Sequence, residues 1–89
     1  MKVVQQTSIL AYVGILEELG ERQKAVYKAI RELQVCNNTQ IADELNLPIS
    51  SITPRVNELR QKGVVVLDKK DYCHITNRLT MFWRVAKRL

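Results

Sequence analysis

Apolar residues recur with helical spacing in two adjacent segments of the first half of the chain. In residues 8–19, Ile9, Val13 and Leu16 lie four and three positions apart, which predicts an amphipathic helix. Residues 21–34, ERQKAVYKAIRELQ, repeat the pattern, and charged or amide side chains fill the opposite side. We therefore expect a second amphipathic helix there. Its apolar stripe consists of Val26, Ile30 and Leu33.

A short helix is predicted over residues 38–45, NTQIADEL. Asn37 precedes it and Gln40 follows three positions later, which is the spacing of a capping box. Asn46 readily takes the left-handed conformation that ends a helix. The residues before this helix, Val35-Cys36, are expected to form a single strand bridge.

The third core helix is predicted within residues 48–63, PISSITPRVNELRQKG. Ile52, Val56 and Leu59 form its apolar stripe, and Gly63 ends it.

Pro54 interrupts this helix because proline lacks an N–H group and restricts the residue before it. Two starting points of this helix are compatible with the proline. Either the helix begins at about Ser50, with Pro54 barely past the first turn, or Thr53 is the N-cap and Pro54 the first helical residue. In both cases the N-terminal end of the helix is exposed.

After Gly63 the pattern changes to that of strands. Residues 64–68, VVVLD, and residues 80–85, TMFWRV, predict a hairpin with an intervening loop of about eleven residues, 69–79. Asn77 tolerates a positive φ, so a tight turn is expected around it at Thr76-Asn77-Arg78.

The order of helix, short helix, turn, helix and hairpin is that of a winged helix-turn-helix. The apolar positions 41, 45, 47, 52 and 56 pack two helices across a tight turn, and Ala42 is small where they cross. On these residues the stretch TQIADELNLPISSITPRVNELRQKGVV resembles the DNA-binding core of MarR-like winged helix proteins. From SILAY to CHITNRLTMFWRV, the chain resembles small single-domain winged helix proteins of phages and bacteria.

This resemblance implies an α+β fold, mainly α with a small β-hairpin, made of an N-terminal helix, three core helices and a wing. It also implies binding to DNA. Proteins of this family tend to carry Thr-Gly-Arg in the wing, where this chain has Thr76-Asn77-Arg78.

The predicted third helix carries most of the candidate DNA-binding residues, because a helix fits the major groove and its N-terminal part meets the base edges. Amides at Asn57 and Gln61 suit bidentate contact with adenine. Arg55 lies nearer the core edge, but its stem is long enough to reach phosphate or guanine. Three further candidates in this helix carry hydroxyl groups, which suit phosphate or base contacts or only cap the helix. These residues are Ser50, Ser51 and Thr53.

The candidate residues of the wing are Lys69, Lys70 and Arg78, which would follow the DNA backbone or enter the minor groove. The alternative for the two lysines is an ordinary solvated turn, because Asp68 and Asp71 flank them. Three further basic residues extend this surface: Arg84, Lys87 and Arg88. Trp83 is expected in the core.

Composition agrees with nucleic acid as the partner. The net charge is +5, and residues 34–89 hold nine basic and five acidic side chains against five and four in residues 1–33. With one histidine, three glycines and no paired carboxylates at useful spacing, we expect neither an enzyme nor a cofactor. Cys36 and Cys73 lack CxxC spacing and are expected to be reduced thiols, not metal ligands.

A single winged helix domain is expected over residues 1–89. Its parts are an N-terminal extension at 1–20, a core at 21–63, a wing at 64–85 and a tail at 86–89. The apolar runs are far shorter than the ~20 residues of a membrane span, and polar residues interrupt any signal-peptide core near the start. We therefore expect a cytoplasmic protein. The helix at 8–19 packs on its own core or pairs with a second copy in a homodimer.

The sequence thus favours sequence-specific binding of double-stranded DNA, by a transcriptional regulator or a phage control protein. Two alternatives stay open. One is a protein–protein interaction adaptor, which Glu44 and Glu58 near the expected DNA face would suit. The other is a replication or recombination accessory that binds DNA without reading its sequence.

Overall fold

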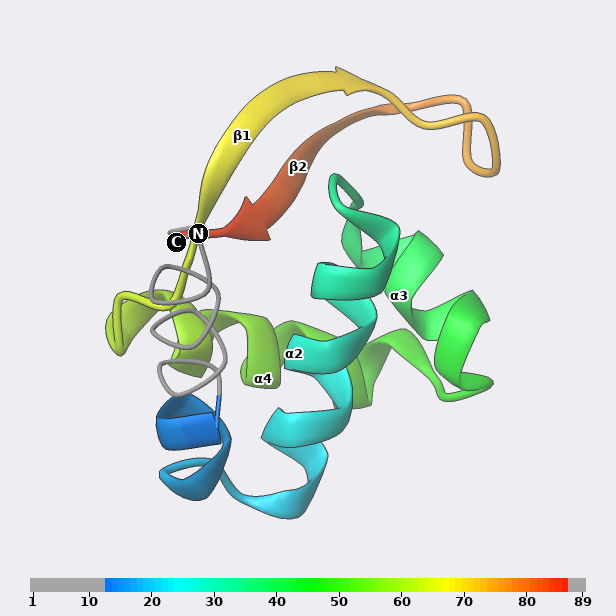
Figure 1. Ribbon diagram of the computed structural model, residues 1–89. Helices are drawn as coiled ribbons and strands as arrows, with labels where there is room; N and C mark the ends of the chain where they lie inside the picture. Colours follow the sequence, from blue (N-terminus) through cyan, green and yellow to red (C-terminus); the bar gives the residue numbers. More distant parts are fainter. Residues whose placement is uncertain (1–12, 87–89) are drawn as a thin grey trace.

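The computed structural model describes residues 13–86, which form a helical core and a long hairpin (Figure 1). Residues 13–17 are helical, in agreement with the predicted first helix, whose remaining residues before 13 lie outside the described part. The expected class, mainly α with a small β-hairpin, is confirmed. The other elements are α2 (Glu21–Leu33), α3 (Asn38–Leu45), α4 (Ile49–Gln61), β1 (Val65–Tyr72) and β2 (Leu79–Val85).

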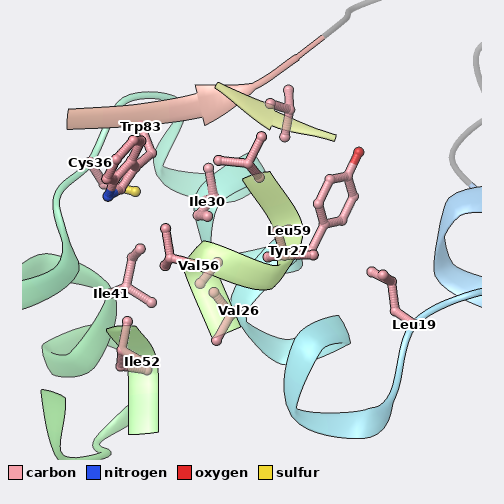
Figure 2. Close-up of a cluster of buried hydrophobic side chains, with 13 residues drawn as sticks. Leu19, Val26, Tyr27, Ile30, Cys36, Ile41, Ile52, Val56, Leu59 and Trp83 are labelled. Atoms are coloured by element: carbon pink, nitrogen blue, oxygen red, sulfur yellow. The ribbon is translucent and has the colours of Figure 1, made fainter. Parts of the chain in front are cut away.

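The core lies between the three helices and is closed by the base of the hairpin (Figure 2). Trp83 of β2 is 3% exposed, which confirms its expected place in the core. Leu33 was wrongly assigned to the apolar stripe of α2 and is 37% exposed, because α2 ends there and the chain turns away at Gln34, with φ of 73°. The helices contribute the predicted stripes. Their fully buried members are Val26, Ile30, Ile41, Ile52, Val56 and Leu59.

Local signals set the bounds of α3. Asn37 Oδ1 accepts from the Gln40 N–H at 2.8 Å, and Gln40 Oε1 accepts from the Asn37 N–H at 3.0 Å, so the predicted capping box is confirmed. Asn46 has the expected left-handed conformation, with φ of 55°. Cys36 forms an isolated antiparallel bridge with Trp83, as expected, and this bridge ties the start of α3 to the wing.

Helix α4 starts at Ile49 with Pro48 as its N-cap, close to the first of the two predicted starts. The second predicted start, with Thr53 as the N-cap, is wrong. Pro54 therefore lies inside the helix, on its exposed side, and its missing N–H leaves the Ser50 carbonyl without the usual helical donor. The outward position keeps the proline ring out of the packed core.

The hairpin is longer than the sequence predicted. The expected loop at 69–79 is wrong, because β1 continues to Tyr72 and β2 begins at Leu79. A bulge at Asp68 lies between the paired residues Leu67↔Trp83 and Lys69↔Phe82. Bulges increase strand twist, and in Figure 1 the hairpin curves over the helices, with its loop on the side of α3.

The loop at residues 73–78 closes on itself. The Cys73 N–H donates to the Arg78 carbonyl at 2.9 Å, and the Asn77 N–H donates to the Cys73 carbonyl at 2.7 Å. Asn77 has φ of 57°, as the predicted turn requires. The turn chemistry was therefore assigned correctly although the strand ends were not.

Candidate nucleic-acid interface

The side of α4 opposite the core faces outward. Ser50, Pro54, Asn57 and Gln61 are all exposed there, and the residues that point the other way are almost completely buried. This confirms the 100° spacing inferred from the apolar stripe. The Asn57 and Gln61 amides have no hydrogen-bond partner within residues 13–86, so both are available to a ligand.

One flank of α4 is joined to the wing through Asn38, the first residue of α3. The Asn38 Oδ1 accepts from Trp83 Nε1 at 2.8 Å, and its Nδ2 donates to Thr53 Oγ1 at 3.3 Å. The Thr53 hydroxyl in turn donates to the Ile49 carbonyl at 3.3 Å. These hydrogen bonds hold α4 and β2 in a fixed relative position. Thr53 thus acts in the structure as a link as well as a candidate contact.

Arg60 lies on the same flank and was not selected from the sequence. Its guanidinium stands 4.7 Å from the centroid of the Trp83 ring, which is a cation–π distance. With Asn57 and Gln61, it lines an open groove between α4 and residues 65–67 of β1. Helical periodicity alone did not single out Arg60, because its aromatic partner belongs to a distant strand.

The other flank of α4 faces α2. Arg55 Nη2 pairs with Glu58 Oε2 at 2.8 Å, and Gln23 Nε2 of α2 donates to Glu58 Oε1 at 2.6 Å. The hydrogen bond from Gln23 and the neighbouring Arg55 hold the pKa of the Glu58 carboxyl below its ordinary value. Glu58 therefore stays ionised and keeps Arg55 on the α2 side, away from the wing.

A shallow hollow lies at the N-terminal end of this flank. It is lined by Ser50, Ser51, Pro54 and Arg55 together with Arg22 of α2. Like Arg60, Arg22 is not among the residues that the sequence predicts for the site. The exposed Arg22 side chain forms no ion pair within the described residues. The hollow thus combines hydroxyl groups with two guanidinium groups beside the start of a helix, where anions are favoured.

Some basic side chains of the wing form ion pairs and others do not. Lys69 Nζ lies 3.4 Å from Asp71 Oδ2 and 5.4 Å from the centroid of the Phe82 ring. The Tyr72 N–H and Lys69 together lower the pKa of Asp71. By contrast, Lys70 and Arg78 are exposed and form no ion pair within residues 13–86.

The remaining basic residue of the hairpin that the structure describes, Arg84, is also paired. Its Nε lies 3.2 Å from Asp68 Oδ1. The predicted wing candidates therefore differ: the solvated-turn interpretation suits Lys69, whereas Lys70 and Arg78 are free to bind an anion.

Both cysteines are free and buried. Burial raises the pKa of the Cys36 thiol to about 12. Among residues 13–86, His, Cys, Asp and Glu side chains do not gather into a group that would hold a metal ion. In the same part of the chain, no helix has the length and apolar character needed to cross a membrane.

Two helices joined by a tight turn, with a hairpin after the second, define a winged helix-turn-helix. The winged helix-turn-helix DNA-binding family matches residues 19–66, more than half of the chain, and the chain therefore belongs to this family. Among solved structures it is similar to the Multiple Antibiotic Resistance Repressor, MarR, with a TM-score of 0.59 and 16% sequence identity. Comparison with curated proteins gives no match.

The similarity to MarR extends over 94% of this chain but only 59% of the repressor. The chain thus spans less than two thirds of that protein. At this level of identity, the likeness demonstrates a MarR-like winged helix fold.

Proposed function

We propose that this chain binds double-stranded DNA as a sequence-specific transcriptional regulator, with α4 in the major groove and the wing on the backbone or in the minor groove. The observation that carries the proposal is the uncovered outer face of α4, bordered on the wing side by Arg60 and on the α2 side by Arg22. The wing adds two unpaired cations, Lys70 and Arg78. All of these residues are exposed. Cations on both sides of a helix suit the two phosphate strands that border a groove.

The dimensions of α4 assign different tasks to its exposed residues. At ~1.5 Å per residue, Ser50 and Asn57 are separated by roughly 10 Å along the helix axis, which fits a major groove about 12 Å wide. Gln61 lies roughly 6 Å further on. We therefore assign base contact to the Ser50–Asn57 part of α4. Gln61 and Arg60 would meet the DNA near the base of the wing.

The assignment of Arg55 depends on its ion pair. To contact DNA, Arg55 must leave Glu58, which is itself held by Gln23. We propose that Arg55 mainly positions α4 against α2, whereas Asn57 reads a base.

A single helix of this size makes few base contacts, so strong specificity requires a dimer or tandem sites. We propose a homodimer that pairs through the N-terminal helix. Ile15 and Leu16 pack against the core, while Val13 is 42% exposed and available to a second copy.

The test is selection from a random duplex pool at physiological salt, followed by measurement of variant affinities. Wild-type protein should enrich a motif, and Asn57→Ala should relax the preference at one base pair, at a cost of about 1–3 kcal/mol. The matched control is Lys28→Ala, which removes an exposed charge from α2. Retention without a motif would support the non-specific accessory and refute sequence-specific recognition.

One observation favours the adaptor alternative. Tyr72, Ile75 and Leu79 near the tip of the wing are 65%, 58% and 61% exposed, and clustered apolar surface often marks a protein contact. If the chain is an adaptor, duplex DNA should show no salt-dependent binding even at low ionic strength. A steep fall in affinity with salt would refute the adaptor interpretation.

A further inference from the structure

Arg60 is a cation near the C-terminal end of α4 whose guanidinium group has no polar partner. It is exposed, and within residues 13–86 its side chain forms no ion pair and no hydrogen bond. The guanidinium instead lies over Trp83, 4.7 Å from the centroid of the ring. A cation–π contact uses none of the five N–H donors of an arginine. Arg60 is therefore held in place while its donors stay available to a ligand.

Trp83 is itself fixed by other contacts. It lies beneath β2 and is 3% exposed (Figure 2). Its Nε1 donates to Asn38 Oδ1 at 2.8 Å, and Asn38 Nδ2 donates to Thr53 Oγ1 at 3.3 Å. Thr53 and Arg60 are two helical turns apart, so both lie on the wing side of α4. The indole is thus connected to α4 at two places, directly at Arg60 and through Asn38 at Thr53, and it gives Arg60 a rigid support.

The groove beside Arg60 suits an anion. Two amide side chains of α4 and residues 65–67 of β1 complete its lining, and none of these residues is acidic. The opposite flank of α4 differs, because Glu58 there pairs with Arg55 at 2.8 Å. Of the two arginines of α4, Arg60 is thus the one whose charge no carboxylate of the described chain balances.

The position of Arg60 along α4 indicates which part of the DNA it would meet. Ser50 and Arg60 are separated by roughly 15 Å along the helix axis, whereas the major groove is about 12 Å wide. With the Ser50–Asn57 part of α4 at the bases, Arg60 lies beyond them, at the strand that borders the groove. A guanidinium presents paired N–H donors that match two oxygens of a phosphate. Its place and its chemistry therefore both suit a backbone phosphate.

We propose that Arg60 binds one backbone phosphate of double-stranded DNA at the base of the wing, and that Trp83 is the positioning residue that holds it ready. The inference rests on the function proposed above and adds to it a named ligand group. Ordering a long side chain on binding costs free energy, so a guanidinium that is already held in place binds more tightly than a mobile one. The contact is independent of base sequence, because every base pair carries the same phosphates.

The first test measures duplex affinity of the full chain against salt for wild type, Arg60→Ala and Arg60→Lys. One phosphate contact contributes about 0.9 to the slope of log K against log salt, so between 50 and 200 mM wild type should lose about 3.5-fold more affinity than Arg60→Ala. Arg60→Lys keeps the charge and the slope but loses the paired donors, and should bind several-fold more weakly than wild type. The control Lys28→Ala, on α2, should leave the slope unchanged. An unchanged slope for Arg60→Ala would overturn the proposal.

The second test separates positioning from an effect on folding. Asn38→Ala removes the acceptor of Trp83 Nε1 and so releases the indole. We expect this change to weaken duplex binding by about threefold or more in wild type, and to have no further effect in an Arg60→Ala background. Equal losses in both backgrounds would overturn the positioning role, because an effect on folding or on Thr53 does not depend on Arg60. Urea unfolding of each variant checks that the protein is folded in the assay.

The sequence of the duplex distinguishes a phosphate contact from a base contact. Across duplexes of different sequence, Arg60→Ala should weaken binding by the same factor. A loss confined to one base pair would overturn the phosphate assignment. If wild type binds no duplex even at low salt, the function proposed above fails together with this inference. If wild type binds with a steep salt slope that Arg60→Ala leaves intact, the proposed function stands and this inference alone fails.

Discussion

The two adjacent lysines of the wing should differ in their contribution to DNA binding. Lys70 and Arg78 are exposed and unpaired within the described residues, whereas Lys69 is paired with Asp71 and lies over Phe82. Lys69 and Lys70 also pair with successive residues of β2, so they project from opposite faces of the hairpin. We predict that the double variant Lys70→Ala/Arg78→Ala loses phosphate contacts, and that Lys69→Ala does not.

The magnitude follows from counterion release. Each phosphate contact contributes about 0.9 to the slope of log K against log salt, so loss of two contacts lowers the slope by about 1.8. Between 50 and 200 mM salt, wild type should therefore lose about 12-fold more affinity than the double variant. The expected change for Lys69→Ala is close to zero.

Fluorescence anisotropy with a labelled duplex, titrated at four or five salt concentrations, measures both slopes. Melting of each variant provides the control for folding, and all should melt within a few degrees of wild type because the substituted side chains are exposed. An equal reduction of the slope by Lys69→Ala would refute the assignment of the two faces. An unchanged slope for the double variant would remove the wing from the interface.

Three further predictions concern the framework of the site. Asn38→Ala removes the partner of Trp83 Nε1 and should cost about 1–2 kcal/mol in urea unfolding; in a Trp83→Phe background the loss should be smaller, and equal losses would refute the link. Pro54→Ala restores a helical donor on an exposed face and should stabilise the protein by about 1–3 kcal/mol; a lower urea midpoint than that of wild type would contradict this. Because the folded pKa of Cys73 is lowered, its contribution to stability is present above pH 9 and lost as pH falls through 7, whereas that of Cys36 is present below pH 9 and lost above it. Cys73→Ser should thus flatten the rise in stability between pH 7 and 9, and Cys36→Ala the fall above 9; unchanged pH profiles would contradict both assignments.

Helix ends and the buried side of each core helix were predictable because local chemistry determines them. The capping box at Asn37 and the left-handed turns at Asn46 and Asn77 each depend on a few neighbouring residues. Leu33 shows the limit of this reasoning. Its spacing fits the apolar stripe, but its exposure depends on where the chain goes after α2.

The candidate site was predictable only in part, for a related reason. Periodicity identified the outward positions of Asn57 and Gln61, since the buried stripe fixes the opposite face. It did not identify Arg60 or Asn38, because both act through Trp83, which approaches them only in the folded chain. Nor did it anticipate that Gln23 and Glu58 retain Arg55 on the α2 side.

The bulge at Asp68 determines which charges the wing presents. In a regular strand, Val65, Leu67 and Lys69 would share the face of Trp83, and Lys70 would lie on the opposite face. The extra residue reverses this order, so that Lys69 is paired with Phe82 and Lys70 with Met81. Asp68 itself pairs with Arg84 and removes that cation from the free set. Composition gives equal weight to every basic residue of the hairpin. The bulge leaves Lys70 as the cation of β1 that is free to bind DNA. Arg78 of the loop is the other cation that we assign to DNA.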